Sequence, residues 1–143
     1  MRTFTDNTGR TWTVAINVAT VKRVRELKQV NLMEAVTGGL INKLEDDICL
    51  FVDVLYCVCK PEADANNISD EQFGSALAGD ALEKATDAFL DELIDFFPGA
   101  KRKMFRAAFQ KQRETEQIAI QKLTERLDRM DMGKLVDAKL KNI

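Results

Sequence analysis

Hydrophobic and polar residues alternate along the start of the chain. Threonine, aromatic and β-branched residues dominate residues 2–6 and 10–16, and an Asn-Thr-Gly sequence separates the two runs. Such residues favour strands, and asparagine and glycine favour a tight turn. Period-two alternation places Trp12, Val14 and Ile16 on one face of the second strand. The pattern predicts an N-terminal β-hairpin, which needs helices or further strands to cover it.

The hydrophobic period changes to that of a helix directly after the hairpin. Asn17 can cap this helix, and its apolar residues recur every three positions, with charged residues between them. The spacing predicts a helix whose inward residues are Val18, Val21, Val24 and Leu27.

Helical patterns continue along the middle of the chain. Asn31 and Glu34 form a capping-box pattern that opens a short helix, and a Gly-Gly pair closes it. A wide apolar stripe predicts a longer helix over residues 41–60, with Leu44, Ile48, Phe51, Val52, Leu55 and Cys59 in the core. We expect Pro61 to end this helix, because proline disfavours continuation of a helix.

Two further helices are predicted in the acidic segment that follows. Residues 62–67 are expected to form a loop, and Ser69 with Gln72 forms the capping box of a short helix. The next helix begins at Gly79-Asp80 and ends before Pro98. Its inward positions are predicted to be Leu82, Ala85, Phe89, Leu93 and the Phe96/Phe97 pair.

The last segment has a different character. Residues 110–117 contain no apolar side chain, and beyond them Ile120, Leu123, Leu127 and Met130 recur at 3-4-3 spacing. This stripe is shorter than the three or four heptads that indicate a coiled coil. The fold class predicted is therefore mainly α with a small N-terminal β-hairpin (α+β). Residues 1–109 form a compact helical body, and residues 110–143 form a projecting, charged, amphipathic helical tail.

Composition supports one soluble globular domain. The chain has 143 residues, of which 45% are hydrophobic and 31% charged. Its longest uncharged apolar run stops at Asp53, far short of a membrane span, and no signal-peptide pattern opens the chain. Cys49, Cys57 and Cys59 all lie in one apolar stretch, as expected for reduced cysteines in a core. We expect the protein in the cytosol, without a membrane partner.

Charge is unevenly distributed although the net charge is only −2. Residues 61–98 are rich in carboxylates and contain Lys84 as their sole basic residue, whereas residues 1–30 and 99–143 are basic. The acidic segment raises the question of a catalytic or metal site. The alternative is a solvated outer face of helices that meet another protein.

The residue types present argue against catalysis. Histidine is absent, which removes the commonest general base and His-containing nucleophile and zinc sites. The cysteines lack zinc-site spacing, and no glycine pattern suits a phosphate loop. A calcium loop starting at Glu62 would require glycine at Asn67 and a bidentate glutamate at Phe73. We therefore expect no enzyme, no catalytic residue, no cofactor and no metal.

Protein contact remains as the class of function that the pattern favours. Basic residues of the tail alternate with glutamate and aspartate, which disfavours a phosphate-binding face and so nucleic acid. An apolar helix face can instead dock on a partner helix. The predicted partner-binding residues are Phe96, Phe97, Phe105 and Phe109 near the junction of body and tail, and Ile120, Leu123, Leu127 and Met130 on the tail. For each residue, a role in the core or in a homodimer contact stays an equal alternative.

The order of elements resembles the tail assembly chaperones of long-tailed bacteriophages and related prophages. The similarity is carried by "RTFTDNTGRTWTVAINVATVKRVREL" and by "LYCVCKPEADANNISDEQFGSALAGDALEKATDAFLDELIDFF", and it covers residues 2–109. Such proteins are small, mostly helical and non-enzymatic. The resemblance implies binding of a tape measure-type helical protein, kept soluble while tail tube subunits polymerise around it; the tail tube protein is then a further partner.

Two alternatives remain beside this expectation. The first is a structural or adaptor virion protein that acts as a homo-oligomer without a client. The second is a small regulatory nucleic-acid-binding protein, which the mixed charges of the tail make less favoured.

Overall fold

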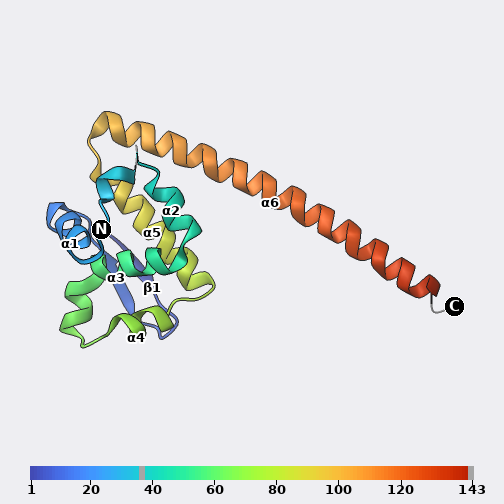
Figure 1. Cartoon of the computed structure of the whole chain (residues 1–143), viewed down its shortest axis with the longest axis horizontal. Helices are drawn as coiled ribbons and strands as arrows, with labels where there is room; N and C mark the ends of the chain where they lie inside the picture. The colour runs from blue at the N-terminus through green and yellow to red at the C-terminus, as the bar shows by residue number, and fades with distance from the viewer. Residues whose placement is uncertain (36–37, 142–143) are drawn as a thin grey trace. The chain divides into compact units, whose positions relative to one another are not determined.

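A computed structural model describes residues 1–35 and 38–141, with residues 131–141 described by their backbone. The fold is mainly helical with a two-stranded antiparallel hairpin at the N-terminus, which confirms the predicted fold class (Figure 1). The chain forms two compact units, Met1–Lys103 and Met104–Ile143. The division falls six positions before the predicted boundary after residue 109, and we call the units the body and the tail.

The hairpin consists of β1 (Arg2–Thr5) and β2 (Thr11–Val14). Phe4 pairs with Trp12 in the ladder. The Asp6 carboxylate organises the turn, because it accepts the backbone N–H groups of Thr8 at 2.9 Å and Arg10 at 3.1 Å. It also accepts the Trp12 indole N–H at 2.9 Å. A buried carboxylate thus stabilises the turn and orients the tryptophan at the same time.

One face of the hairpin belongs to the core, as the alternation predicts. Phe4, Trp12 and Val14 are buried, while Ile16 beyond the strand is half-buried. Helix α5 (Asp80–Phe96) packs on β1, and α3 (Ile48–Ala65) packs on β2. Phe73 fills the space beneath, with its ring edge-on to Trp12 at 5.0 Å between centroids.

Helix α1 (Val18–Lys28) has the predicted cap but a different buried face. Asn17 and Thr20 form a capping box, which confirms the predicted helix start. The prediction that Val18 and Leu27 point inward is wrong, because both are exposed. Residues three apart step backward by about 60° on a helix, so a run of four such positions covers half the circumference. Only Val24 in the middle of the run is fully buried, and Val21 is half-buried.

The next predicted helix is a short 3-10 helix, η1 (Leu32–Ala35). The Asn31 side chain accepts the backbone N–H of Met33 at 3.0 Å, so asparagine does open this turn. Residues 36–37 of the predicted helix lie outside the described residues.

The long helix predicted over residues 41–60 is two helices. Helix α2 spans Leu40–Asp46. Asp47 follows it in an extended conformation and caps the start of α3, where its carboxylate accepts the N–H of Leu50 at 3.1 Å. The break changes the helical register. Ile48, predicted as a core residue, is therefore exposed, and Val52 is half-buried.

Pro61 does not end α3, which continues to Ala65. Proline has no N–H, so the carbonyl of Cys57, four residues earlier, loses its helical donor. The guanidinium of Arg23 supplies that donor at 3.0 Å. Residues 62–65, predicted as part of a loop, are consequently helical.

The remaining boundaries follow the predictions. Ser69 and Gln72 form a capping box at the start of α4 (Asp70–Ser75). Helix α5 begins after Gly79, whose positive φ of 57° suits glycine, and Pro98 separates it from α6 (Gly99–Lys141). Ala85, Phe89 and Leu93 are buried as predicted, while Leu82 is half-buried.

Candidate partner-binding surface

Four apolar side chains of the tail lie on one face of α6. Ile120, Leu123, Leu127 and Met130 have exposed fractions between 50% and 62%. Their 3-4-3 spacing confines them to about 80° of the helix circumference. We call these four residues the tail stripe. It is an apolar surface that the described part of the chain does not bury.

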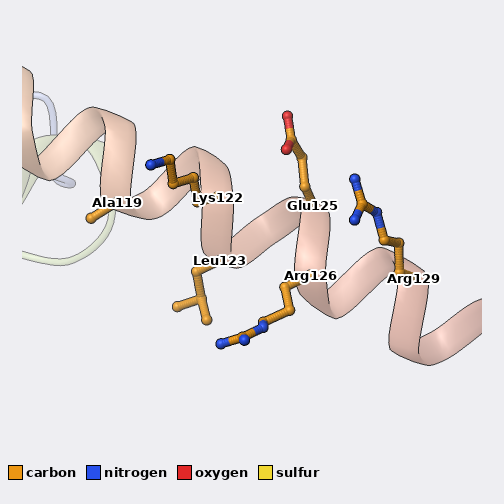
Figure 2. Close-up of a pocket in the computed structure, with 6 residues that line it drawn as sticks. All are labelled: Ala119, Lys122, Leu123, Glu125, Arg126 and Arg129. Carbon is orange, nitrogen blue, oxygen red and sulfur yellow. The ribbon is translucent and has the colours of Figure 1, made fainter.

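Charged residues flank the tail stripe. Figure 2 shows a shallow hollow lined by Ala119, Lys122, Leu123, Glu125, Arg126 and Arg129. Lys122, Glu125 and Arg129 extend on one side of the helix, and Leu123 extends on the other. All these side chains come from a single helix, which cannot enclose a small molecule. The geometry suits an elongated partner that lies along α6.

Aromatic residues occupy the same face of α6 nearer its start. The rings of Phe105 and Phe109 are stacked with centroids 6.5 Å apart, and the Arg113 guanidinium lies 4.6 Å from the centre of the Phe109 ring. Phe109 is half-buried, whereas Phe105 is buried. Phe105 is therefore removed from the predicted binding surface, because a buried ring offers little area to a partner.

The two phenylalanines at the end of α5 differ in the same way. Phe97 is 2% exposed, and its ring lies edge-on to that of half-buried Phe96 at 6.1 Å between centroids. Phe97 follows the last residue of α5 with an extended backbone, so its side chain turns into the core. Phe97 is thus a core residue, and Phe96 keeps only a partly exposed edge. Both belong to the body, whereas the tail stripe belongs to the tail.

Two exposed apolar residues of α6 lie outside the predicted surface. Met104 is 66% and Ile118 is 54% exposed. Both lie on the side of the helix away from the tail stripe, Met104 about 120° and Ile118 about 160° from its centre by helical geometry. Neither residue fits the helical spacing of the tail stripe, so periodicity does not distinguish either of them from an ordinary surface residue.

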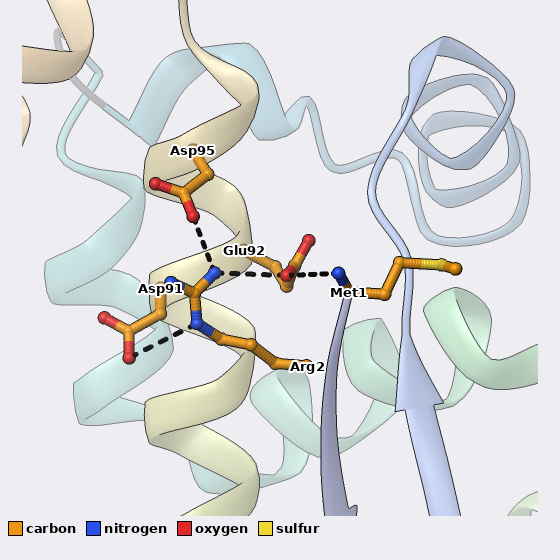
Figure 3. A network of polar contacts seen from close by, with 5 residues as sticks. All are labelled: Met1, Arg2, Asp91, Glu92 and Asp95. Atoms are coloured by element: carbon orange, nitrogen blue, oxygen red, sulfur yellow. Dashed lines mark hydrogen bonds and ion pairs between the residues drawn. The ribbon is translucent and has the colours of Figure 1, made fainter.

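Three carboxylates of the acidic segment form an ion cluster with the N-terminus of the chain. Arg2 of β1 contacts Asp95 at 2.7 Å, Glu92 at 3.1 Å and Asp91 at 3.8 Å, all on α5 (Figure 3). The amino group of Met1 lies 3.5 Å from Glu92. These pairs attach the first strand to α5. In the described part of the chain, no group of three or more Cys, Asp or Glu side chains is arranged to hold a metal ion.

Cys57 and Cys59 are buried as predicted, whereas the prediction of a core position is wrong for Cys49. Burial, with a smaller effect of Glu62, raises the pKa of Cys59 to about 12. Burial also raises the pKa of Cys57. Both thiols therefore stay protonated at neutral pH, and a thiol is a weak nucleophile and metal ligand. Cys49 is exposed.

Comparison with models of protein families, with curated proteins and with solved structures finds no match for this chain. Over the described residues, every helix is too short or too polar to cross a membrane.

Proposed function

We propose that this chain is a non-enzymatic binding protein that holds a long helix of a client protein along α6. The observation that carries the proposal is the tail stripe, four aliphatic side chains at helical spacing that are half exposed or more. In the setting that the sequence resemblance implies, the client is a tape measure-type protein of a bacteriophage tail. The tail tube protein is then a further partner, and the site of action is the bacterial cytoplasm.

The physical argument rests on what apolar surface does in water. Burial of apolar area contributes about 25 cal/mol per Å², so an exposed aliphatic row favours a partner that covers it. Residues at 3-4-3 spacing are the knobs that pack between the side chains of a second helix. The charged faces around the tail stripe stay in water in such a complex, which keeps an apolar client helix soluble.

A pair of matched variants tests this role. Leu123→Asp places a carboxylate in the tail stripe, and Gln121→Asp makes the same product residue on the opposite face of the same helix. Co-expressed with a tape measure-type protein, the wild-type chain is expected to retain the client in the soluble fraction. Leu123→Asp is expected to weaken client binding at least about tenfold, and Gln121→Asp to leave it unchanged. Retention is measured by co-purification and by pelleting.

Two outcomes would overturn the proposal. One is a client that stays equally soluble without this chain. The other is equal loss with both variants, which would indicate a general effect of charge on α6. Light scattering that shows one tight homo-oligomer, with the chain present in finished particles, would instead support the structural or adaptor role.

A further inference from the structure

Basic residues lie along one side of the tail stripe. Helical geometry places Arg126 about 40° beyond the edge of the stripe, and Lys122 and Arg129 about 80° and 100° beyond the same edge. All three side chains are exposed. Figure 2 shows that Arg126 extends on the same side of α6 as Leu123 of the stripe. We call Lys122, Arg126 and Arg129 the basic flank.

The positive charge of the basic flank exceeds the negative charge around it. The hollow on α6 is lined by these three basic residues and by a single carboxylate, that of Glu125. Among the described side chains, none forms an ion pair with Lys122, Arg126 or Arg129. Unpaired cations beside an apolar row favour a partner whose carboxylates come to lie opposite them.

The other side of the tail stripe has no such charge. It begins with Thr124 and Gln117, and its first charged residue is Asp128, about 80° from the edge of the stripe. Between residues 117 and 130, a second copy of α6 would therefore bring to the basic flank either uncharged side chains or its own Arg126. A second copy is thus a poor match for the basic flank, and a helix with carboxylates is a good one.

We propose that the helix that covers the tail stripe is acidic along one edge, with a row of carboxylates that meets the basic flank. This inference rests on the proposed function and names the chemistry of the client. Residues beside an apolar seam form ion pairs with the opposite helix, and these pairs determine partner choice and orientation. Because the positive charge lies on one side of the stripe, the client helix is expected to bind in one direction.

Three synthetic helical peptides test the proposal on the full chain. Each has leucine at 3-4-3 spacing with glutamine along one edge, and the other edge carries glutamate, glutamine or lysine. Fluorescence anisotropy of the labelled peptides measures their affinities. The glutamate peptide is expected to bind at least about tenfold more tightly than the lysine peptide, with the glutamine peptide between them. The difference is expected to shrink as salt rises.

Matched charge reversals locate the effect on α6. Arg126→Glu reverses a charge beside the tail stripe, and Lys111→Glu makes the same change about 22 Å earlier along the helix, beyond the screening length at physiological salt. Arg126→Glu is expected to lower the preference for the glutamate peptide over the lysine peptide at least about fivefold. Lys111→Glu is expected to change it less than about twofold. If a variant is unstable, the comparison of the three peptides on the wild-type chain still decides.

Leu123→Asp separates this inference from the function on which it rests. Equal affinities of the three peptides for the wild-type chain, all lost in Leu123→Asp, would overturn the acidic edge and support the tail stripe as a helix-binding surface. Failure of every peptide to bind the wild-type chain, or unchanged binding in Leu123→Asp, would overturn both.

Two further results would assign the basic flank to another partner and overturn the proposal. One is a homodimer of the free chain that persists in excess glutamate peptide, which would make a second copy of this chain the occupant. The other is double-stranded DNA that binds more tightly than the glutamate peptide at physiological salt and is released by Arg126→Glu. That result would assign the basic flank to phosphate groups.

Discussion

The body and the tail use the same kinds of apolar residue in opposite ways. In the body, Trp12, Phe89 and Leu93 are at most 1% exposed. In the tail, Leu123 and Leu127 on α6 are at least 50% exposed. The body buries most of its large apolar residues, whereas most of those described in the tail are exposed. The difference teaches that a hydrophobic pattern at helical spacing predicts a face but does not identify what covers it.

The source of helical order differs as well. The body helices are shorter than α6. Helices α1 and α4 begin with capping boxes, and α3 and α5 pack against the hairpin. Helix α6 is long and rich in strong helix formers, and the Gln112 amide donates to the Glu116 carboxylate, four residues on, at 3.4 Å. Variants should therefore act on stability when they touch the body and on binding when they touch the tail stripe.

The largest difference is expected between two substitutions by alanine, one in the core of the body and one in the tail stripe. Phe89→Ala removes a fully buried ring that lies edge-on to Phe51 at 5.5 Å, and should lower the free energy of unfolding by about 3–5 kcal/mol. Leu127→Ala in the tail stripe should change it by less than about 0.5 kcal/mol. Urea denaturation followed by the fluorescence of Trp12, the single tryptophan, measures the body. Equal effects of the two variants would remove the distinction between the units.

The second contrast concerns a buried carboxylate. Burial alone would raise the pKa of Asp6, but hydrogen bonds from the Thr8 and Trp12 side chains and from backbone N–H groups outweigh it and lower the pKa below the ordinary 3.8. The unfolded chain thus takes up the proton first on acidification. The stabilisation is complete above about pH 3.8 and is lost as pH falls through the lower folded value.

Asp6→Asn tests this sign. At neutral pH this substitution should lower the free energy of unfolding by about 1–3 kcal/mol. The asparagine amide has one oxygen, a weaker acceptor, and an NH₂ group in place of the second carboxylate oxygen. Its stability should also fall less steeply than that of the wild type on acidification. Asp128→Asn on α6 is the control and should leave the Trp12 transition unchanged. A variant that keeps the full wild-type acid dependence would contradict the role of Asp6.

A smaller contrast tests how α3 passes through Pro61. Arg23→Leu removes the donor to the Cys57 carbonyl and should cost about 1–3 kcal/mol. Adding Pro61→Ala to that variant restores a backbone N–H four residues after Cys57 and should recover most of the loss. A double-mutant cycle from urea denaturation measures the coupling. Strictly additive effects would show that Arg23 does not compensate for proline.

The smallest effect is expected at the ion cluster of β1 and α5. Arg2→Gln should cost less than about 1 kcal/mol, because the Arg2 side chain is 36% exposed and the pairs are screened by salt. The loss should shrink further at high ionic strength. Lys122→Gln on α6 is the matched charge removal and should not alter the body. A larger loss of unfolding free energy that does not depend on salt would show that the cluster stabilises the body as strongly as core packing does.

Features that depend on neighbouring residues were predictable. The hairpin, the Asn17 and Ser69 caps and the break at Pro98 all follow from residues a few positions apart. The tail stripe was predictable for the same reason, since helical spacing alone places its residues on one face. Which phenylalanines are buried was not predictable. Phe97 is buried because the backbone is extended at the end of α5, and helical spacing does not reveal this.

The sequence by itself determined the mainly helical class, most element starts and the apolar face of the tail, because propensity, capping and periodicity act over one or two turns. Tertiary structure decided which face of α1 is buried, how α3 continues past Pro61, and which hairpin edge α3 covers. Each of these depends on a group distant along the chain, such as Arg23 at the Cys57 carbonyl or Glu62 at the Thr13 N–H. A single hydrogen bond between distant segments can override a local preference. Proline disfavours a helix because a backbone hydrogen bond is lost, and the Arg23 side chain replaces that hydrogen bond.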